Sequence, residues 1–152
     1  MKNYVIITIT ILLLLSCGKK NKDTEIYLKV INNIEDCTDI KDCIQFSDNR
    51  GNAVSLPGKP EVFTSKVNAG KWVIWMGAND SDPKIEIIEV NFKEVTGSKN
   101  ILEKTKMKEK DGIVRGKVKP KDSLHKDDIE FYSITFKINN VEYTIDPKLE
   151  YH

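Results

Sequence analysis

The strongest constraint on the fold is a strict alternation of apolar and polar residues near the C-terminus. Large apolar side chains occupy every second position of one segment: Tyr132, Ile134, Phe136 and Ile138. Asn139-Asn140 follows, and asparagine tolerates the positive φ that a two-residue hairpin turn requires. Val141, Tyr143 and Ile145 then resume the alternation. We therefore predict an antiparallel hairpin with one apolar face.

Shorter extended segments separated by turn residues recur upstream. They cover residues 25–31, 44–46, 53–56, 61–67, 71–78, 84–92 and 113–118. Asn68-Ala69-Gly70 joins two of them and predicts a second hairpin. Because there are about eight or nine such strands and hardly any helical periodicity, we predict an all-β fold, an antiparallel β-sandwich of the immunoglobulin or cupredoxin type.

Two segments leave alternatives open. In residues 84–92 the apolar phase changes at Ile87-Ile88, which indicates either a β-bulge or a strand that is buried on both faces. In residues 96–111, Ile101 and Leu102 precede a charged run. That segment fits a short helix or an irregular crossover, and we interpret its charges as a solvated surface.

The N-terminus predicts export. Lys2 precedes a run of apolar and hydroxyl residues over positions 4–15, and Ser16-Cys17 then leads into a polar segment. A charged start, an apolar run of this length and a small residue at its end are the parts of a signal peptide. The alternative is an uncleaved transmembrane helix, but the run is shorter than the ~20 residues that a span requires.

The sequence Leu14-Leu15-Ser16-Cys17 resembles the lipobox of bacterial lipoproteins. The resemblance implies that residues 1–16 are removed, that Cys17 carries a diacylglyceryl thioether and that its amino group is acylated. Acyl chains that each contribute about 0.8 kcal/mol per buried methylene would form a durable membrane anchor. Residues 17–24 would be the lipidated cysteine and a flexible tether, and residues 25–152 the β-sandwich domain. The residue directly after Cys17 is glycine, which resembles the pattern of lipoproteins that are sent to the outer membrane. We therefore expect the protein in the cell envelope, at the outer membrane.

The charge balance argues against nucleic acid as a partner. Removal of residues 1–16 leaves 152 − 16 = 136 residues and removes one charge, Lys2, so that 24 − 1 = 23 basic residues face 23 acidic ones. A neutral domain lacks the electrostatic footprint of a nucleic-acid-binding protein. Arg50 and Arg115 are the only arginines, which gives little support to bidentate recognition of phosphate.

Cys37 and Cys43 remain after the lipidated cysteine is set aside. In an exported protein we predict that they form a structural disulfide across a short loop. Free thiols, a redox pair or two metal thiolates are the alternatives. The spacing is not C-x-x-C, and no histidine lies near enough in sequence to complete a zinc site.

A second resemblance concerns the domain itself. Residues 67–75, with residues 132–138 and 143–148, resemble small exported bacterial β-sandwich proteins, and residues 67–75 also look like a strand pair of cupredoxins. A blue-copper site requires two histidines, a cysteine and usually a methionine. No histidine follows Trp75, His125 lies in a charged loop and His152 is the last residue of the sequence. We therefore predict no copper, no other metal and no cofactor.

The sequence contains few other motifs for metal binding or catalysis. Asp80-Ser81-Asp82 offers two carboxylates for calcium but lacks the glycine and distal glutamate of an EF-hand loop, so we interpret it as a turn. No G-x-S-x-G sequence and no phosphate-binding glycine loop is present. Asp127-Asp128 lies in a segment that we interpret as a solvated loop.

Trp72 and Trp75 are the candidate contact residues. Because they are three positions apart on a predicted strand, they point to opposite faces. We expect one in the core and the other covered by a loop or by residues 96–111. The alternative is an exposed tryptophan that stacks on a sugar or anchors a protein contact.

Together these features predict a lipid-anchored cell-envelope protein that is a non-catalytic binding or assembly module for a protein or a glycan. A small envelope hydrolase with clustered carboxylates and a purely structural lipoprotein are the alternatives. An exposed aromatic patch on one sheet would favour the binding module. A concave pocket with converging carboxylates and a perturbed pKa would favour the hydrolase.

Overall fold

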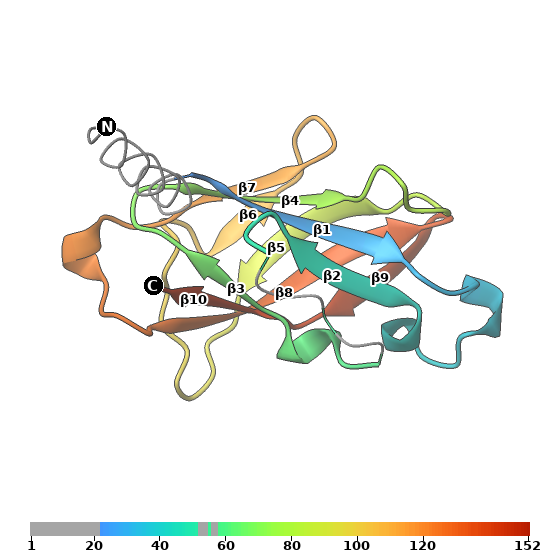
Figure 1. The fold of residues 1–152 in the computed structure, drawn as a ribbon, viewed down its shortest axis with the longest axis horizontal. Helices are drawn as coiled ribbons and strands as arrows, with labels where there is room; N and C mark the ends of the chain where they lie inside the picture. Colours follow the sequence, from blue (N-terminus) through green and yellow to red (C-terminus); the bar gives the residue numbers. More distant parts are fainter. Residues whose placement is uncertain (1–21, 52–54, 56–57) are drawn as a thin grey trace, which may run out of the picture.

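The computed structural model describes residues 22–51, 55 and 58–152 (Figure 1). Cys17, the predicted signal peptide and most of the predicted tether lie outside these residues, as does the strand predicted over residues 53–56 apart from Ser55. The described strands are Thr24–Val30 (β1), Ile44–Asp48 (β2), Thr64–Val67 (β3), Trp72–Gly77 (β4), Glu86–Phe92 (β5), Lys106–Lys108 (β6), Val114–Lys117 (β7), Ile129–Ile138 (β8), Val141–Ile145 (β9) and Lys148–Tyr151 (β10). Short 3-10 helices cover Ile34–Asp36 (η1), Ile40–Asp42 (η2), Pro60–Val62 (η3) and Lys121–Ser123 (η4).

The strands form two sheets with a shared core. One sheet has the order β2-β1-β4-β7, and the other has the order β3-β10-β8-β5-β6, with β9 paired to β8. Most neighbours are antiparallel, but β1 runs parallel to β4 and β3 runs parallel to β10. The prediction of an all-β sandwich is therefore confirmed, although both sheets are mixed and the description as antiparallel holds only approximately.

The core forms where alternate residues of both sheets face each other. Ile26, Leu28 and Val30 of β1 are buried, as the period of two predicts. From the four-stranded sheet Trp75 reaches Tyr132 on β8, with ring centroids 5.6 Å apart. The Trp75 indole N–H donates a hydrogen bond of 3.1 Å to the Tyr132 hydroxyl oxygen. This contact joins the two sheets across the middle of the sandwich.

The C-terminal hairpin has the predicted form. Asn139 and Asn140 have φ angles of 49° and 64°, the left-handed values that a tight hairpin turn requires. Ile138 then pairs with Val141, and the two strands continue with apolar residues opposite one another. The alternation in the sequence thus set both the turn and the register.

The second predicted hairpin is wrong. Strand β3 belongs to the six-stranded sheet and β4 belongs to the four-stranded sheet, so Asn68-Ala69-Gly70 connects the two layers instead of folding back within one. Gly70, with φ of 68°, donates its N–H to the carbonyl oxygens of Val118 and Lys119 at 3.1 Å each. A tight turn with glycine suits either connection, and the long-range contacts of the turn decide which one forms.

The structure decides between the alternatives for residues 84–92 and for residues 96–111. The pairing of β5 with β8 shifts register between Ile87 and Glu89, which confirms the β-bulge. As a result, Ile87 and Val90 are both fully buried although they lie three positions apart. Residues 96–111, all of which the structure describes, contain no helix; they form an irregular crossover that includes β6.

The crossover is attached to the core through Glu130 of β8. Its fully buried side chain accepts hydrogen bonds at Oε2 from the backbone N–H groups of Ile101 (2.5 Å) and Leu102 (2.9 Å). Its Oε1 atom has no hydrogen-bond partner among the described residues. Burial raises the pKa of the Glu130 carboxyl to about 7, because desolvation outweighs the two backbone hydrogen bonds and the charge of Lys119.

We therefore expect this carboxyl to make the free energy of unfolding depend on pH. Because its folded pKa of about 7 lies above the unfolded value, the folded protein holds the proton more tightly. The contribution of the Glu130 proton to the free energy of unfolding is complete below about pH 4 and is lost as pH rises through about 7. The loss is on the order of 3 kcal/mol.

We predict that the free energy of unfolding in urea differs less between pH 5 and pH 8 in Glu130→Gln than in the wild type, because the variant lacks this proton. Glu142→Gln, at an exposed position of β9, should leave the difference unchanged. Equal pH dependence in the wild type and Glu130→Gln would show that Glu130 is not the group responsible.

Candidate functional site

The two tryptophans of β4 point to opposite faces, as predicted. Trp75 is fully buried, whereas 43% of Trp72 is exposed. The expectation that the outer tryptophan is covered is wrong. The crossover of residues 96–111 packs inward instead, since Leu102 is fully buried and forms a bridge with Val118 beyond the end of β7. It closes the core and leaves the outer face of β4 open.

Trp72 belongs to a row of apolar side chains on the outer face of the four-stranded sheet. Ile74 and Met76 follow it at every second position of β4, and Tyr27 is the partner of Met76 on β1. All three are half-buried, while the intervening Val73 is fully buried beneath the sheet. We call Tyr27, Trp72, Ile74 and Met76 the Trp72 strip.

Polar side chains surround the strip and hold two of its members. Arg115 and Glu25 flank Ile74 from β7 and β1, and Lys117 is the partner of Trp72. The Tyr27 hydroxyl donates a hydrogen bond to Glu25, which together with burial raises the pKa of Tyr27 to about 12. The backbone N–H of Trp72 donates to Asp23 Oδ1 at 2.9 Å. The strip therefore has hydrogen-bonded contacts at both ends and cations along its β7 side.

The outer face of the six-stranded sheet has a different character. Ion pairs join Lys66 to Glu150 and Lys106 to Glu89 across its strands. The half-buried Phe131 ring lies beneath the Lys148 ammonium group, 5.0 Å from the ring centroid. Among the described residues, the large hydrophobic side chains that remain exposed are Val62, Trp72, Val95 and Val141. Trp72 is thus the one aromatic residue in that exposed set.

The predicted disulfide is present. Cys37 and Cys43 are bonded, with Cα atoms 6.2 Å apart, and the loop between them contains η2. Cys43 lies directly before β2, and its carbonyl oxygen accepts a hydrogen bond of 2.9 Å from Ile31 N–H. The bond closes the connection from β1 to β2 and contributes about 2 kcal/mol by the chain-entropy relation for so short a loop.

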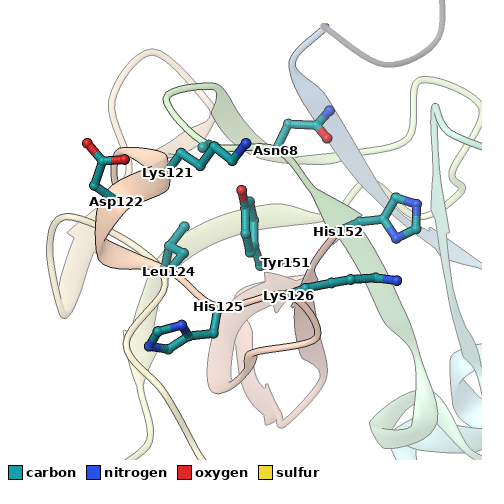
Figure 2. A pocket seen from close by; sticks show the side chains of 9 residues that line it. Asn68, Lys121, Asp122, Leu124, His125, Lys126, Tyr151 and His152 are labelled. Atoms are coloured by element: carbon teal, nitrogen blue, oxygen red, sulfur yellow. The ribbon is translucent and has the colours of Figure 1, made fainter.

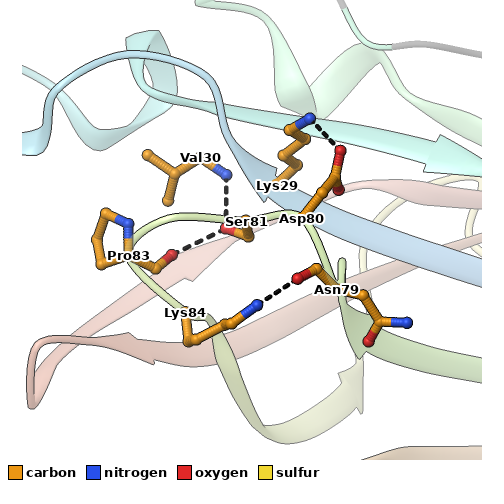
Figure 3. Close-up of polar contacts among 7 residues, drawn as sticks. All are labelled: Lys29, Val30, Asn79, Asp80, Ser81, Pro83 and Lys84. Carbon is orange, nitrogen blue, oxygen red and sulfur yellow. Dashed lines mark hydrogen bonds and ion pairs between the residues drawn. The ribbon is translucent and has the colours of Figure 1, made fainter.

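The side chains of Asp80 and Ser81, in the loop between β4 and β5, contact β1 and the backbone of the loop itself (Figure 3). Asp80 forms an ion pair with Lys29 of β1, and the hydrogen bond from that lysine holds the pKa of the Asp80 carboxyl below its usual range. Ser81 Oγ accepts from Val30 N–H at 3.0 Å and donates to the Pro83 carbonyl oxygen at 2.9 Å. These contacts agree with the interpretation as a turn.

A depression of about 620 Å³ lies at one end of the sandwich (Figure 2). It is lined by Asn68, Ala69, Lys121, Asp122, Leu124, His125, Lys126, Tyr151 and His152. The Tyr151 side chain stands between the two histidines, with its hydroxyl directed toward Lys121. The sequence gives no sign that His125 and His152 are neighbours. The fold brings them to one surface because β10 pairs with β8 and β3.

The features that a hydrolase of the predicted kind requires are separated. Glu130, whose pKa is raised to about 7, is fully buried beneath the crossover. It does not line the depression, whose residues include one carboxylate, Asp122. This depression and the carboxyl with the raised pKa therefore lie in different parts of the described structure.

Comparisons with known proteins give no family assignment. No family model matches the chain, and no curated protein matches it. Among solved structures, the chain is similar to the inclusion body protein PixA from Burkholderia cenocepacia J2315, with a TM-score of 0.45 and 13% sequence identity over 90% of this chain and 98% of that chain. Similarity of this degree assigns no function. The described residues include no helix that is long and apolar enough to cross a membrane.

The two tryptophans should respond differently to truncation. Trp75→Ala should lower the free energy of unfolding by about 3–5 kcal/mol, because it leaves a cavity in the core. Trp72→Ala should lower it by about 1 kcal/mol or less, because nearly half of the side chain is already exposed to water. Urea unfolding followed by circular dichroism measures both values. A loss in Trp72→Ala as large as that in Trp75→Ala would show that Trp72 is a core residue.

Proposed function

We propose that the protein is a lipid-anchored binding module of the bacterial cell envelope and that the Trp72 strip is its binding face. The observation that carries the proposal is the exposed Trp72, in line with Ile74 and Met76 on an outer sheet face. Such a row leaves a continuous strip of apolar surface in contact with water. An apolar patch with a polar rim is a common feature of interaction sites.

The residue types of this face favour a protein as the partner. Trp, Tyr, Met and Arg are enriched in protein interfaces, and Trp72, Tyr27, Met76 and Arg115 lie together here. A tryptophan at the centre of an interface commonly contributes a large share of the binding energy. Arg115 on the β7 side, together with Lys117, whose ammonium group lies 3.9 Å from Glu103 Oε1, would suit a partner with an apolar centre and an acidic rim.

The N-terminal lipid would fix where this partner is met. Residues 18–23 separate Cys17 from Thr24 at the start of β1, so the Cα atoms of those two residues are at most about 25 Å apart. Asp23, the last of them, accepts the hydrogen bond from Trp72 N–H. The strip would therefore begin at the tether and extend away from it along β4, within reach of other proteins at the same membrane surface.

Site-specific photo-crosslinking in the producing cells tests this function. A benzoylphenylalanine at position 76 should give a discrete protein adduct. The matched position Thr144, exposed on the outer side of β9, should give none. Trp72→Ala should weaken the contact by about 30-fold, the equivalent of roughly 2 kcal/mol, and the adduct at position 76 should be lost. In the same cells the wild type should incorporate labelled palmitate and Cys17→Ser should not.

Each other outcome counts against part of the proposal. Equal adducts at positions 76 and 144 would show that the strip has no special role. If position 76 gives no protein adduct but the wild type, unlike Trp72→Ala, sediments with envelope polysaccharide, the ligand is a glycan. Absence of palmitate from the wild type, or equal labelling of Cys17→Ser, would contradict the lipid anchor.

A further inference from the structure

Contrary to the expectation from the sequence that no metal is bound, we propose that Asp127, Glu150 and His152 bind a divalent transition-metal ion, with zinc as the test ion. One carboxylate oxygen from each acid and one imidazole nitrogen from His152 all lie within 4.8 Å of one another. Ligands of a tetrahedral zinc ion at about 2.1 Å from the metal are roughly 3.4 Å apart. Because the donor atoms lie within 4.8 Å of one another, no pair has to approach by more than about 1.4 Å to reach that spacing.

The backbone brings the three residues together without any bond between their side chains. Glu150 and His152 are two positions apart at the end of β10, so they extend from the same side of the strand, while the intervening Tyr151 is buried. His152 N–H donates to the Val67 carbonyl oxygen at 3.2 Å, which extends the pairing of β10 with β3. The position of His152 is therefore set by the sheet.

Asp127 comes from the loop that leads into β8. Its backbone N–H donates to the Tyr151 carbonyl oxygen, and Tyr151 N–H donates to the Asp128 carbonyl oxygen, both at 2.9 Å. These two bonds fasten the loop to the same residue that separates Glu150 from His152. Two elements that are distant in sequence thus deliver three donors to one point.

The donor set suits a transition metal better than calcium or magnesium. Imidazole is a ligand for zinc, nickel and copper, whereas calcium and magnesium prefer oxygen alone. Two carboxylates would neutralise the ion, and three protein ligands leave a coordination position for water. Lys66 Nζ lies 3.8 Å from Glu150 Oε1, a distance at which the ion pair is weak, and a bound metal would take its place.

The site is independent of the Trp72 strip. His152 also borders the depression, and so does His125, which Figure 2 shows on the other side of Tyr151. His125 therefore provides a matched control, since it is a second exposed histidine on the same surface and is not a member of the three-residue cluster. Metal binding and partner binding can be tested without reference to each other.

Isothermal titration of the purified, untagged full chain with zinc chloride tests the site. The wild type should bind one ion with a saturable isotherm, and calcium chloride should give no comparable heat. Asp127→Asn, Glu150→Gln and His152→Ala should each lower the affinity at least tenfold. Asparagine suits position 127, where φ is 67°, because it tolerates left-handed backbone. His125→Ala should bind zinc as the wild type does.

A second readout separates binding from loss of fold. Circular dichroism of the metal-free variants should match that of the wild type, and a cobalt titration of the wild type should give visible absorption bands that His152→Ala lacks. Absence of saturable zinc binding by the wild type would overturn the proposal. An equal loss of affinity in His125→Ala and His152→Ala would overturn the assignment of the three ligands.

Discussion

The contact between Trp75 and Tyr132 is the interaction on which the rest of the structure depends. Each side chain comes from a different sheet, and both are fully buried. They combine an edge-on ring contact with a hydrogen bond of 3.1 Å from indole to hydroxyl. Without that bond the indole N–H would be left in an apolar interior, which costs about 1–3 kcal/mol. The pair therefore fixes the phase of both strands.

The phase of each strand then determines what the surface presents. With Trp75 directed inward, the alternation of β4 directs Trp72, Ile74 and Met76 outward. With Tyr132 directed inward, β8 also turns Glu130 into the core, where it accepts the backbone hydrogen bonds of the crossover. An exposed tryptophan and a buried glutamate are thus two consequences of one internal contact.

Local pattern in the sequence was enough for several features. Asn139-Asn140 and the alternation around it specify a hairpin by themselves, and the phase change at Ile87-Ile88 locates a bulge that the register confirms. The bonded cysteines Cys37 and Cys43 are close in sequence, so chain geometry alone brings them within reach. In each case the residues that carry the signal are separated by few positions in the sequence.

Features that depend on distant segments were not predictable in the same way. The turn at Asn68-Ala69-Gly70 has hairpin chemistry, yet its strands join different sheets, because β3 pairs with β10 and β4 with β1. The exposure of Trp72 depends on where Leu102 packs, about thirty residues later in the chain. Asp127 and His152 meet only because β10 lies between β8 and β3.

A double-mutant cycle on Trp75 and Tyr132 tests the central claim most directly. Trp75→Phe, Tyr132→Phe and the double variant keep an aromatic ring at each position but remove the hydrogen bond. Urea unfolding of the four proteins should give a coupling free energy on the order of 1 kcal/mol, because the two groups are each other's partner in a dry core. Strictly additive losses would contradict the account, since they would show that the two sheets are not held together by this contact.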